Sequence, residues 1–161
     1  MTRFALLLPL LAWVAWTGDA QARTPQDAAA QPPTAFDAAL AERLGADDYG
    51  MRSYVLVILK TGPTPVAEGP ARKAMFAGHF ANMKRLAEQG TLVLAGPLDG
   101  VDGWRGLFVL AVDGIEAARA AVATDPVVVA GEMVPEFHTW YGSAGVMAIP
   151  DLHARIAKKE I

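Results

Sequence analysis

Two segments of the chain that favour strand structure are apolar at consecutive positions rather than at alternate ones. They are "SYVLVILKT" (Ser53 to Thr61) and "WRGLFVLAV" (Trp104 to Val112), both rich in β-branched and aromatic residues, which favour strands. A strand with one face in water alternates apolar with polar residues. We therefore expect these two strands to belong to a sheet that is covered on both faces.

The remaining segments complete a recognisable order of elements. Helical periodicity and helix stop signals predict helices over Glu68 to Gln89 and Gly114 to Thr124. Further strands are predicted over Thr91 to Leu98 and Glu132 to Gly142, and Pro135 places the last of these at a sheet edge or at a bulge. "DGVDG" between the second and third strands has the composition of a hairpin loop. The order β-α-β-β-α-β predicts an α+β fold of the ferredoxin-like class, an antiparallel sheet with two helices on one face.

The second face of such a sheet needs a cover of its own, since two helices cover only one face. A large bare apolar face is rare in a soluble monomer. One solution is a second subunit packed sheet to sheet, which gives a dimeric α/β barrel and a homodimer. The alternative is that the N-terminal arm and the C-terminal tail fold over this face.

The N-terminus has the pattern of a secretory signal. A basic start is followed by thirteen apolar residues, Phe4 to Trp16, and by the small-residue site Ala20-Gln21-Ala22. Thirteen residues are fewer than the roughly 20 that span a bilayer as a helix. We expect residues 1–22 to be a signal peptide that is cut after Ala22, which makes the protein periplasmic or secreted and leaves no membrane segment. An N-terminal anchor that is never cleaved is the alternative.

The chain then divides into three further parts. Residues 23–52 form a flexible linker and a short helix with Phe36, Leu40 and Leu44 on one side, closed by Gly45. Residues 53–142 form the folded domain. Residues 143–161 form a tail with a short helix, for which Asp151 is a candidate N-cap.

Composition excludes several classes of function. The formal net charge of the 161 residues is −3 and there is no cysteine, so the chain forms no disulfide, has no thiol nucleophile and carries no basic surface for nucleic acid. Neither Gly-x-Gly-x-x-Gly nor a Gly-Lys-Ser/Thr phosphate loop occurs, and the two serines are not in a nucleophile elbow. The three histidines are far apart in sequence, so we expect no metal site and no cofactor.

His79 is the most informative polar residue. Residues three, four or seven positions apart lie on the same side of a helix. His79 follows Phe76 by three positions and precedes Met83 by four and Leu86 by seven. The imidazole therefore lies inside the apolar arc and not on the opposite face with Arg85. A buried polar group needs a partner, because leaving it unpaired costs about 1–3 kcal/mol. Helical position alone favours a satisfied core histidine over a catalytic one.

Other polar residues near the predicted element ends are candidates for a site. Asp125 in "TDPVVVAG" is suited to cap a short helical turn that begins at Pro126. Arg105, Asn82, His138, Trp140 and Tyr141 are each structural when taken alone. Together they suggest a pocket for a small polar organic molecule.

Four ordered motifs give the chain a family resemblance. "YVLVILKTGP", "HFANMKRLAEQGTLVLAGP", "TDPVVVAG" and "EFHTWYG" resemble the YciI-like (YCII-related) domain over Ser53 to Gly142. The resemblance implies a ferredoxin-like fold that dimerises into an α/β barrel. It also implies that His79 and Asp125 form an active-site pair. Some relatives are lyases or dehydrochlorinases of ring compounds, and the barrel is shared with muconolactone isomerase-like enzymes. Val127 stands where the family usually has an aromatic residue, so the substrate is not transferred.

The resemblance and the inward histidine together favour an acid–base enzyme without a cofactor, of lyase, isomerase or hydrolase type. In this hypothesis His79 moves a proton, Asp125 orients the imidazole and stabilises its cation, and Arg105 binds a carboxylate or enolate oxygen of the substrate. The alternatives are a dimeric periplasmic module that binds a small molecule without turnover, and a protein that binds a partner through its N-terminal arm or its terminal helix.

Overall fold

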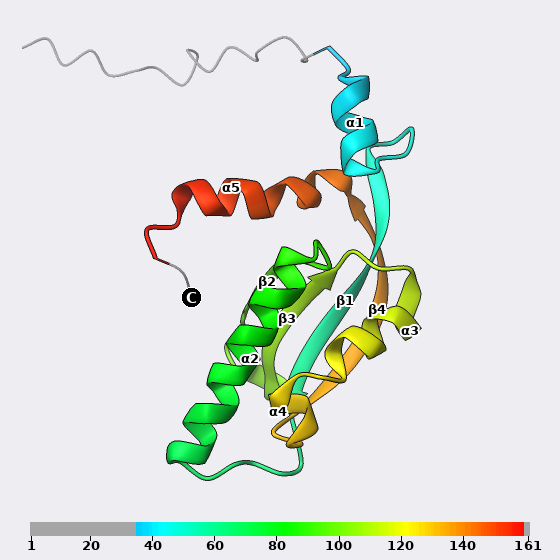
Figure 1. Cartoon of the computed structure of the whole chain (residues 1–161). Helices are drawn as coiled ribbons and strands as arrows, with labels where there is room; N and C mark the ends of the chain where they lie inside the picture. The colour runs from blue at the N-terminus through cyan, green and yellow to red at the C-terminus, as the bar shows by residue number, and fades with distance from the viewer. Residues whose placement is uncertain (1–34, 160–161) are drawn as a thin grey trace, which may run out of the picture. The chain divides into compact units, whose positions relative to one another are not determined.

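A computed structural model describes residues 35–159; the predicted signal peptide, its cleavage site and residues 23–34 of the linker lie outside this range. Four strands form one antiparallel sheet in the order β2-β3-β1-β4 (Figure 1). Their bounds are β1 (Met51–Thr61), β2 (Leu92–Pro97), β3 (Trp104–Leu110) and β4 (Met133–Ser143). This order and the helix positions confirm the predicted α+β, ferredoxin-like fold.

Three helices lie on one face of the sheet: α2 (Pro70–Glu88), α3 (Gly114–Val122) and the short α4 (Pro126–Val129) (Figure 1). The helix predicted to continue to Thr124 ends at Val122, because a new helix begins with Pro126 at its first position. Proline suits that position, since it lacks the N–H that would be unsatisfied there. For the same reason α2 begins at Pro70, two residues later than predicted.

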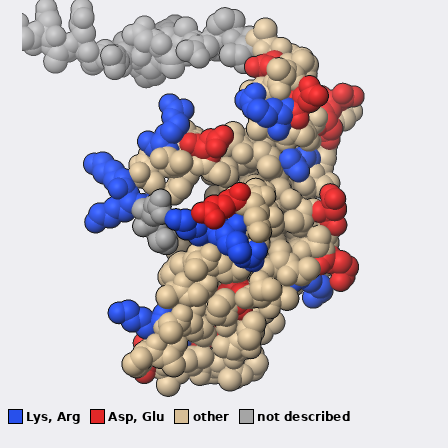
Figure 2. Space-filling view, in the orientation of Figure 1, with Lys and Arg blue, Asp and Glu red and all other residues tan. Residues whose placement is uncertain are grey.

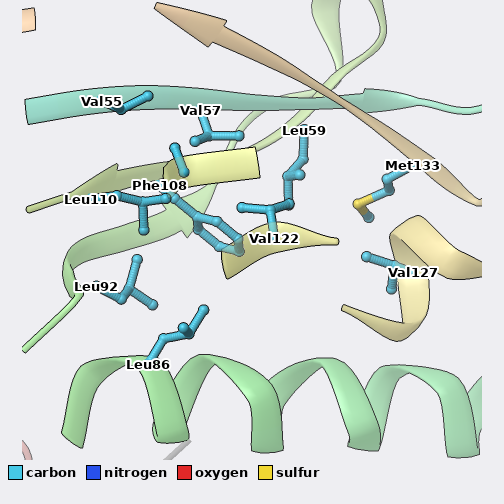
Figure 3. Packing of buried hydrophobic residues seen from close by; sticks show 11 residues of the cluster. Val55, Val57, Leu59, Leu86, Leu92, Phe108, Leu110, Val122, Val127 and Met133 are labelled. Carbon is cyan, nitrogen blue, oxygen red and sulfur yellow. The ribbon is translucent and has the colours of Figure 1, made fainter. Parts of the chain in front are cut away.

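The main core lies between the sheet and these helices. Val55, Val57 and Leu59 alternate along β1 and point to the helices, as Figure 3 shows. They meet Leu86 of α2 and Val127 of α4. The core is completed by Leu92, Phe108, Leu110, Ala118, Val122 and Met133.

The opposite face of the sheet is covered at one end by the C-terminal tail. Tyr54, Val93 and Val109 form a second buried cluster, against which Val146 and Met147 of the 3-10 turn Ala144–Ala148 pack. The proposed cover by the tail is thus present over part of this face. The N-terminal arm contributes less, since all seven residues of α1 (Ala38–Leu44) remain partly or fully exposed.

The rest of this second face is partly open and carries exposed apolar side chains beside the Lys60–Glu136 ion pair. The side chains of Leu94, Trp104 and Val134, from three different strands, are 37%, 41% and 46% exposed. All three side chains lie on the same face of the sheet as Ile58. Leu94 pairs with Val109, and Trp104 and Val134 both pair with Lys60 of β1. Val109 and Lys60 lie on the face of Ile58, because side chains alternate along a strand. We refer to Leu94, Trp104 and Val134 as the open apolar patch.

Irregular pairing occurs in β3 and β2, whereas Pro135 is in a regular edge strand. β4 forms the sheet edge beside β1, with Pro135 opposite Leu59 and continuous register. Arg105 is an extra residue in β3, inserted where the β1 pairing shifts between Leu59 and Lys60. Such a bulge turns a side chain to the other face, and Arg105 points to the helix side, toward Glu132.

The C-terminal helix α5 (Ile149–Ile156) begins differently from the prediction. Its N-cap is Ala148, and Asp151 lies inside the first turn instead of capping it. The reason is that α5 follows directly from the 3-10 turn Ala144–Ala148, which moves the start of the helix upstream. No helix within residues 35–159 is both long and apolar enough to cross a bilayer.

Candidate functional site

His79 lies at the centre of the buried face of α2. The buried residues of this helix are His79, Asn82 and Leu86, whereas Phe80 is 43% exposed. The buried face is therefore rotated from the predicted apolar arc, since it extends to Asn82, one turn beyond His79, and leaves Phe80 outside. His79 is only 7% exposed, and two polar side chains share the buried face instead of one.

Asp125 is the partner of this histidine. The Nδ1 atom of His79 is 2.9 Å from each of the two carboxylate oxygens of Asp125, which is fully buried. The same carboxylate caps α4, because its Oδ1 accepts a 3.1 Å hydrogen bond from the Val127 N–H. Both expectations for Asp125 are thus met at once. It is a helix cap and a partner of His79.

The environment of His79 leaves one ring nitrogen available. Asp125 also accepts from Asn82 and Val127, as an ionised carboxylate does, so Nδ1 carries a proton and donates to it. Nε2 makes no hydrogen bond to any described residue. It is also not among the fully buried polar atoms of these residues that lack a partner. Nε2 is therefore accessible to solvent. The ring centres of Phe76, Phe80 and Phe108 lie 5.4–6.2 Å from the centre of the imidazole ring.

Asn82 belongs to this site as a support for Asp125. Its Nδ2 donates to Asp125 Oδ2 over 3.2 Å, and its Oδ1 accepts from Arg85 Nη2 over 2.7 Å. A shallow groove of about 450 Å³ runs along the outside of this group, lined by Gly78, Ala81, Asn82, Arg85, Thr124 and Pro126. α2 and α4 approach closely here. A Cβ atom on Gly78 of α2 would lie only 2.9 Å from Pro126 Cγ of α4.

A second buried carboxylate lies at the other end of α4. Glu132 is 2% exposed, with Oε1 2.7 Å from Arg72 Nη1 and Oε2 2.7 Å from the Val66 backbone N. Arg105 Nη1 is 3.8 Å from Oε1. Burial opposes ionisation, but the hydrogen bonds from Val66 and Arg72 and the charges of Arg72 and Arg105 outweigh it. They hold the pKa of the Glu132 carboxyl below its ordinary value.

This second cluster was missed in the sequence, although part of it could have been found. Arg72 lies seven residues before His79, which is two helical turns, and so shares its side of α2. Its guanidinium lies 4.9 Å from the centre of the Phe76 ring, and that ring meets His79 edge-on at 6.2 Å. Arg72, Phe76 and His79 therefore form a continuous row along the helix. Nothing in the local pattern around Glu132 indicates its partner.

His138 and Trp140 are on the opposite side of the sheet from His79. They pair with Leu56 and Tyr54 of β1 and share their face, because side chains alternate along a strand. His138 Nε2 contacts Glu136 Oε1 at 2.8 Å, and Trp140 stacks on Tyr54 at 5.3 Å. Hydrogen bonds from His138 and then from Lys60 lower the pKa of Glu136.

The single pocket expected from these residues is therefore not formed within the described chain. Asn82 lies beside His79, and Arg105 is on the same side of the sheet. His138 and Trp140 are separated from them by the sheet itself. Tyr141 hydrogen-bonds to Asp47 near the start of β1. Within residues 35–159, no three metal-ligating side chains gather into a cluster.

The surface above the site carries few charges. Figure 2 shows Lys, Arg, Asp and Glu at α1, around α5 and the end of α2, and along the right-hand edge, whereas the surface over the middle of α2 and over α4 is largely uncharged. Together with the three phenylalanine rings, this favours an apolar, planar group beside the imidazole over a highly charged one.

Comparison with known proteins identifies a family model and similar solved structures. The model of the YCII-related domain matches residues 53–136, which is just over half of the chain. No curated protein matches significantly. Among solved structures, the fold is similar to 5-chloro-2-hydroxyhydroquinone dehydrochlorinase from Burkholderia phenoliruptrix AC1100 in complex with 2,5-dihydroxybenzoquinone. That similarity has a TM-score of 0.38 and 18% identity, over 53% of this chain and 92% of the other.

Proposed function

The chain belongs to the YCII-related domain family, and from the contact between His79 and Asp125 we propose that it is a cofactor-independent acid–base enzyme for a small organic molecule. The reaction is of lyase, isomerase or hydrolase type. The observation that carries this proposal is the buried carboxylate on Nδ1 of a histidine whose Nε2 remains accessible.

In the proposed mechanism, His79 Nε2 takes a proton from a carbon or hydroxyl group of the substrate and later returns it. Asp125 keeps the neutral ring in the tautomer protonated at Nδ1, which leaves the Nε2 lone pair free to act as a base. When the ring becomes a cation, the adjacent carboxylate stabilises it. The α4 cap and Asn82 hold the carboxylate in place, so orientation is set before substrate arrives.

The side chains around His79 support one class of substrate. Phe76 and Phe80 provide apolar surface beside the imidazole, and Phe108 stacks on the ring from within the core. This apolar setting suits a flat or ring-shaped compound. Arg105 is on the same side of the sheet, and within residues 35–159 its guanidinium has one polar approach, 3.8 Å to Glu132. Its guanidinium therefore retains donors for a carboxylate or an enolate oxygen. His138 and Trp140 are left out of this proposed site.

A ligand screen followed by a turnover assay tests the proposal. Small aromatic acids, phenols and lactones are screened by thermal shift, and hits are incubated with the enzyme and analysed for product. His79→Gln is expected to abolish turnover, whereas His153→Gln, an exposed histidine of α5, is expected to leave it unchanged. Turnover that survives His79→Gln contradicts the mechanism. Binding without turnover by the wild-type protein favours the non-catalytic binding module.

A homodimer is proposed from the open apolar patch. Trp104 and Val134 lie beyond the part of the sheet that the tail covers, and Leu94 lies at its margin, opposite Val109. A second copy packed there would remove these side chains from water. Light scattering after size exclusion is expected to give twice the chain mass. Leu94→Glu is expected to produce monomers, whereas Val129→Glu, an exposed apolar residue of α4, is not. A wild-type monomer at micromolar concentration contradicts this proposal.

Export is proposed from the N-terminal sequence alone. In a bacterial host, the mature protein is expected to begin at Arg23 and to be released with the periplasmic fraction. Intact-mass spectrometry of the purified protein measures the cleavage directly. A full-length chain that remains with the membrane fraction supports the uncleaved anchor instead.

A further inference from the structure

A chain of hydrogen bonds connects Asp125 to a surface arginine. Asn82 Nδ2 donates to Asp125 Oδ2, and Asn82 Oδ1 accepts from Arg85 Nη2. Thr124 Oγ1 lies 3.5 Å from the same Oδ1 and 3.4 Å from Arg85 Nη2. Arg85 is itself held at its other terminal nitrogen by Gln89, 3.1 Å away.

This arrangement determines which way the amide of Asn82 faces. An amide has an acceptor end and a donor end, and only the donor end stabilises a carboxylate. Arg85 has no acceptor, so it binds the oxygen end of Asn82 and leaves the NH2 group directed at Asp125. Without Arg85, Asn82 Oδ1 keeps only the longer 3.5 Å contact with Thr124 Oγ1 among the described residues. The amide is then held less firmly as a donor to Asp125, which is shielded from water.

We propose that Arg85 is a positioning residue, which acts through Asn82 to hold the Asp125 carboxylate and thereby sets the basicity of His79. This inference rests on the proposed role of His79, but it concerns residues that the mechanism did not use. Arg85 was predicted on the helix face opposite the core, and it reaches the site from there through one intermediate side chain.

The direction of the effect follows from electrostatics. A carboxylate with fewer hydrogen-bond donors attracts the adjacent imidazolium more strongly, so loss of Arg85 or of the Asn82 donor raises the pKa of His79. A change of one net hydrogen bond corresponds to about half a pH unit or more. The groups that face the imidazole are Asp125 from the α4 cap, Asn82 from α2, the rings of Phe76, Phe80 and Phe108, and, beyond Phe76, the Arg72–Glu132 pair.

NMR titration of His79 in the full chain tests this proposal without requiring a substrate. Arg85→Met is expected to raise the pKa of His79 by about half a pH unit. Lys73→Met removes the same charge from an exposed position on the same helix and is expected to leave that pKa unchanged. If Arg85→Met does not fold, Arg85→Gln replaces it with the same expected direction.

A double-variant cycle separates the hydrogen-bond chain from a charge acting through space. In the Asn82→Ala background, Arg85→Met is expected to cause no further change in the pKa of His79, because the connection is already broken. A full additional rise in that background overturns the proposal, as does an unchanged value in Arg85→Met alone.

The outcome is independent of the test of the proposed function. If turnover depends on His79 but the pKa of His79 is unchanged in Arg85→Met, the positioning role of Arg85 is wrong and the acid–base role of His79 stands. If the pKa responds to Arg85 through Asn82 but no substrate is turned over, the hydrogen-bond chain is real and the proposed enzyme activity is wrong.

Discussion

Glu132→Gln tests how α4 and the strand that follows it are held to α2. Each oxygen of the buried Glu132 carboxylate has its own donor: Arg72 Nη1 on Oε1 and the Val66 N–H on Oε2, both at 2.7 Å. Glutamine keeps the length of the side chain but has a single acceptor oxygen. Its NH2 group must then face either a guanidinium or a backbone N–H, and one hydrogen bond to a charged group is lost.

The expected loss of stability is about 2 kcal/mol, because hydrogen bonds that involve a charged partner contribute about 1.5–3 kcal/mol each. For a domain of this size, the melting temperature should fall by roughly 8 °C. Urea denaturation and thermal melts at pH 7 measure both quantities. Glu136→Gln is the control, since this carboxylate is accessible to solvent on β4 and is paired only with accessible groups, and it should leave the melting temperature unchanged.

The pKa of Glu132 also determines how this stability difference changes with pH. The folded pKa of Glu132 lies below its ordinary value of 4.5, so on descending from pH 7 the unfolded state binds the proton first. The stability that Glu132 contributes is therefore present above about pH 4.5 and is lost as the pH falls through the folded pKa. The glutamine variant has no such contribution, and the difference between it and the wild type should narrow in acid. A variant as stable as the wild type at pH 7, or a difference that stays constant down to pH 3, refutes the reasoning.

Two further predictions concern the contact between α2 and α4. Asp125→Ala removes the α4 cap and the hydrogen-bond acceptor of His79 and Asn82. The free energy of unfolding in urea should fall by about 2–4 kcal/mol. A loss below about 1 kcal/mol would mean that the carboxylate is a cap alone. Gly78→Val should lower the free energy of unfolding by about 1–3 kcal/mol, because its Cβ would lie 2.9 Å from Pro126 Cγ. Thermal melts measure this, with Ala81→Val as the control. An unchanged melting temperature would show that α4 moves aside freely.

Local sequence signals were sufficient for the elements and their order. Consecutive apolar residues in β1 correctly indicated a sheet that is covered on both faces at least in part, since Tyr54 and Val57 are both buried although they lie on opposite faces. Proline and glycine placed the element ends to within a few residues. The exception is α5, where a 3-10 turn that precedes the helix leaves no signal distinct from the helix itself.

The site was harder to predict because alternation and bulges decide which face a side chain takes. His138 and Trp140 differ from Phe137 and Thr139 only by one position in β4, and that position moves them to the far side of the sheet. Arg105 would also lie on that far side if β3 were regular, but the extra residue turns it toward Glu132. A pocket assembled from residue types near strand ends is therefore unreliable until the register is known.

Asp125 shows why a local role and a tertiary role should not be weighed against each other. The chain contains a useful comparison in Asp37, which caps α1 through a 2.9 Å hydrogen bond from Leu40 N and remains exposed. Asp125 also caps its helix through a side-chain oxygen, which accepts from Val127 N two residues on, but the helix it begins is "PVVV", whose Val127 is fully buried in the core.

A cap acceptor uses one of the lone-pair positions on a carboxylate, and about four are available. At Asp37 water can satisfy the remainder. At Asp125 the apolar helix draws the cap into the core, so the protein must supply donors, and His79 and Asn82 do so from α2. An aspartate before a short apolar helix thus predicts, by itself, that a polar side chain lies opposite. In this chain the inward-facing histidine of α2 was the residue in the sequence that most needed such a partner.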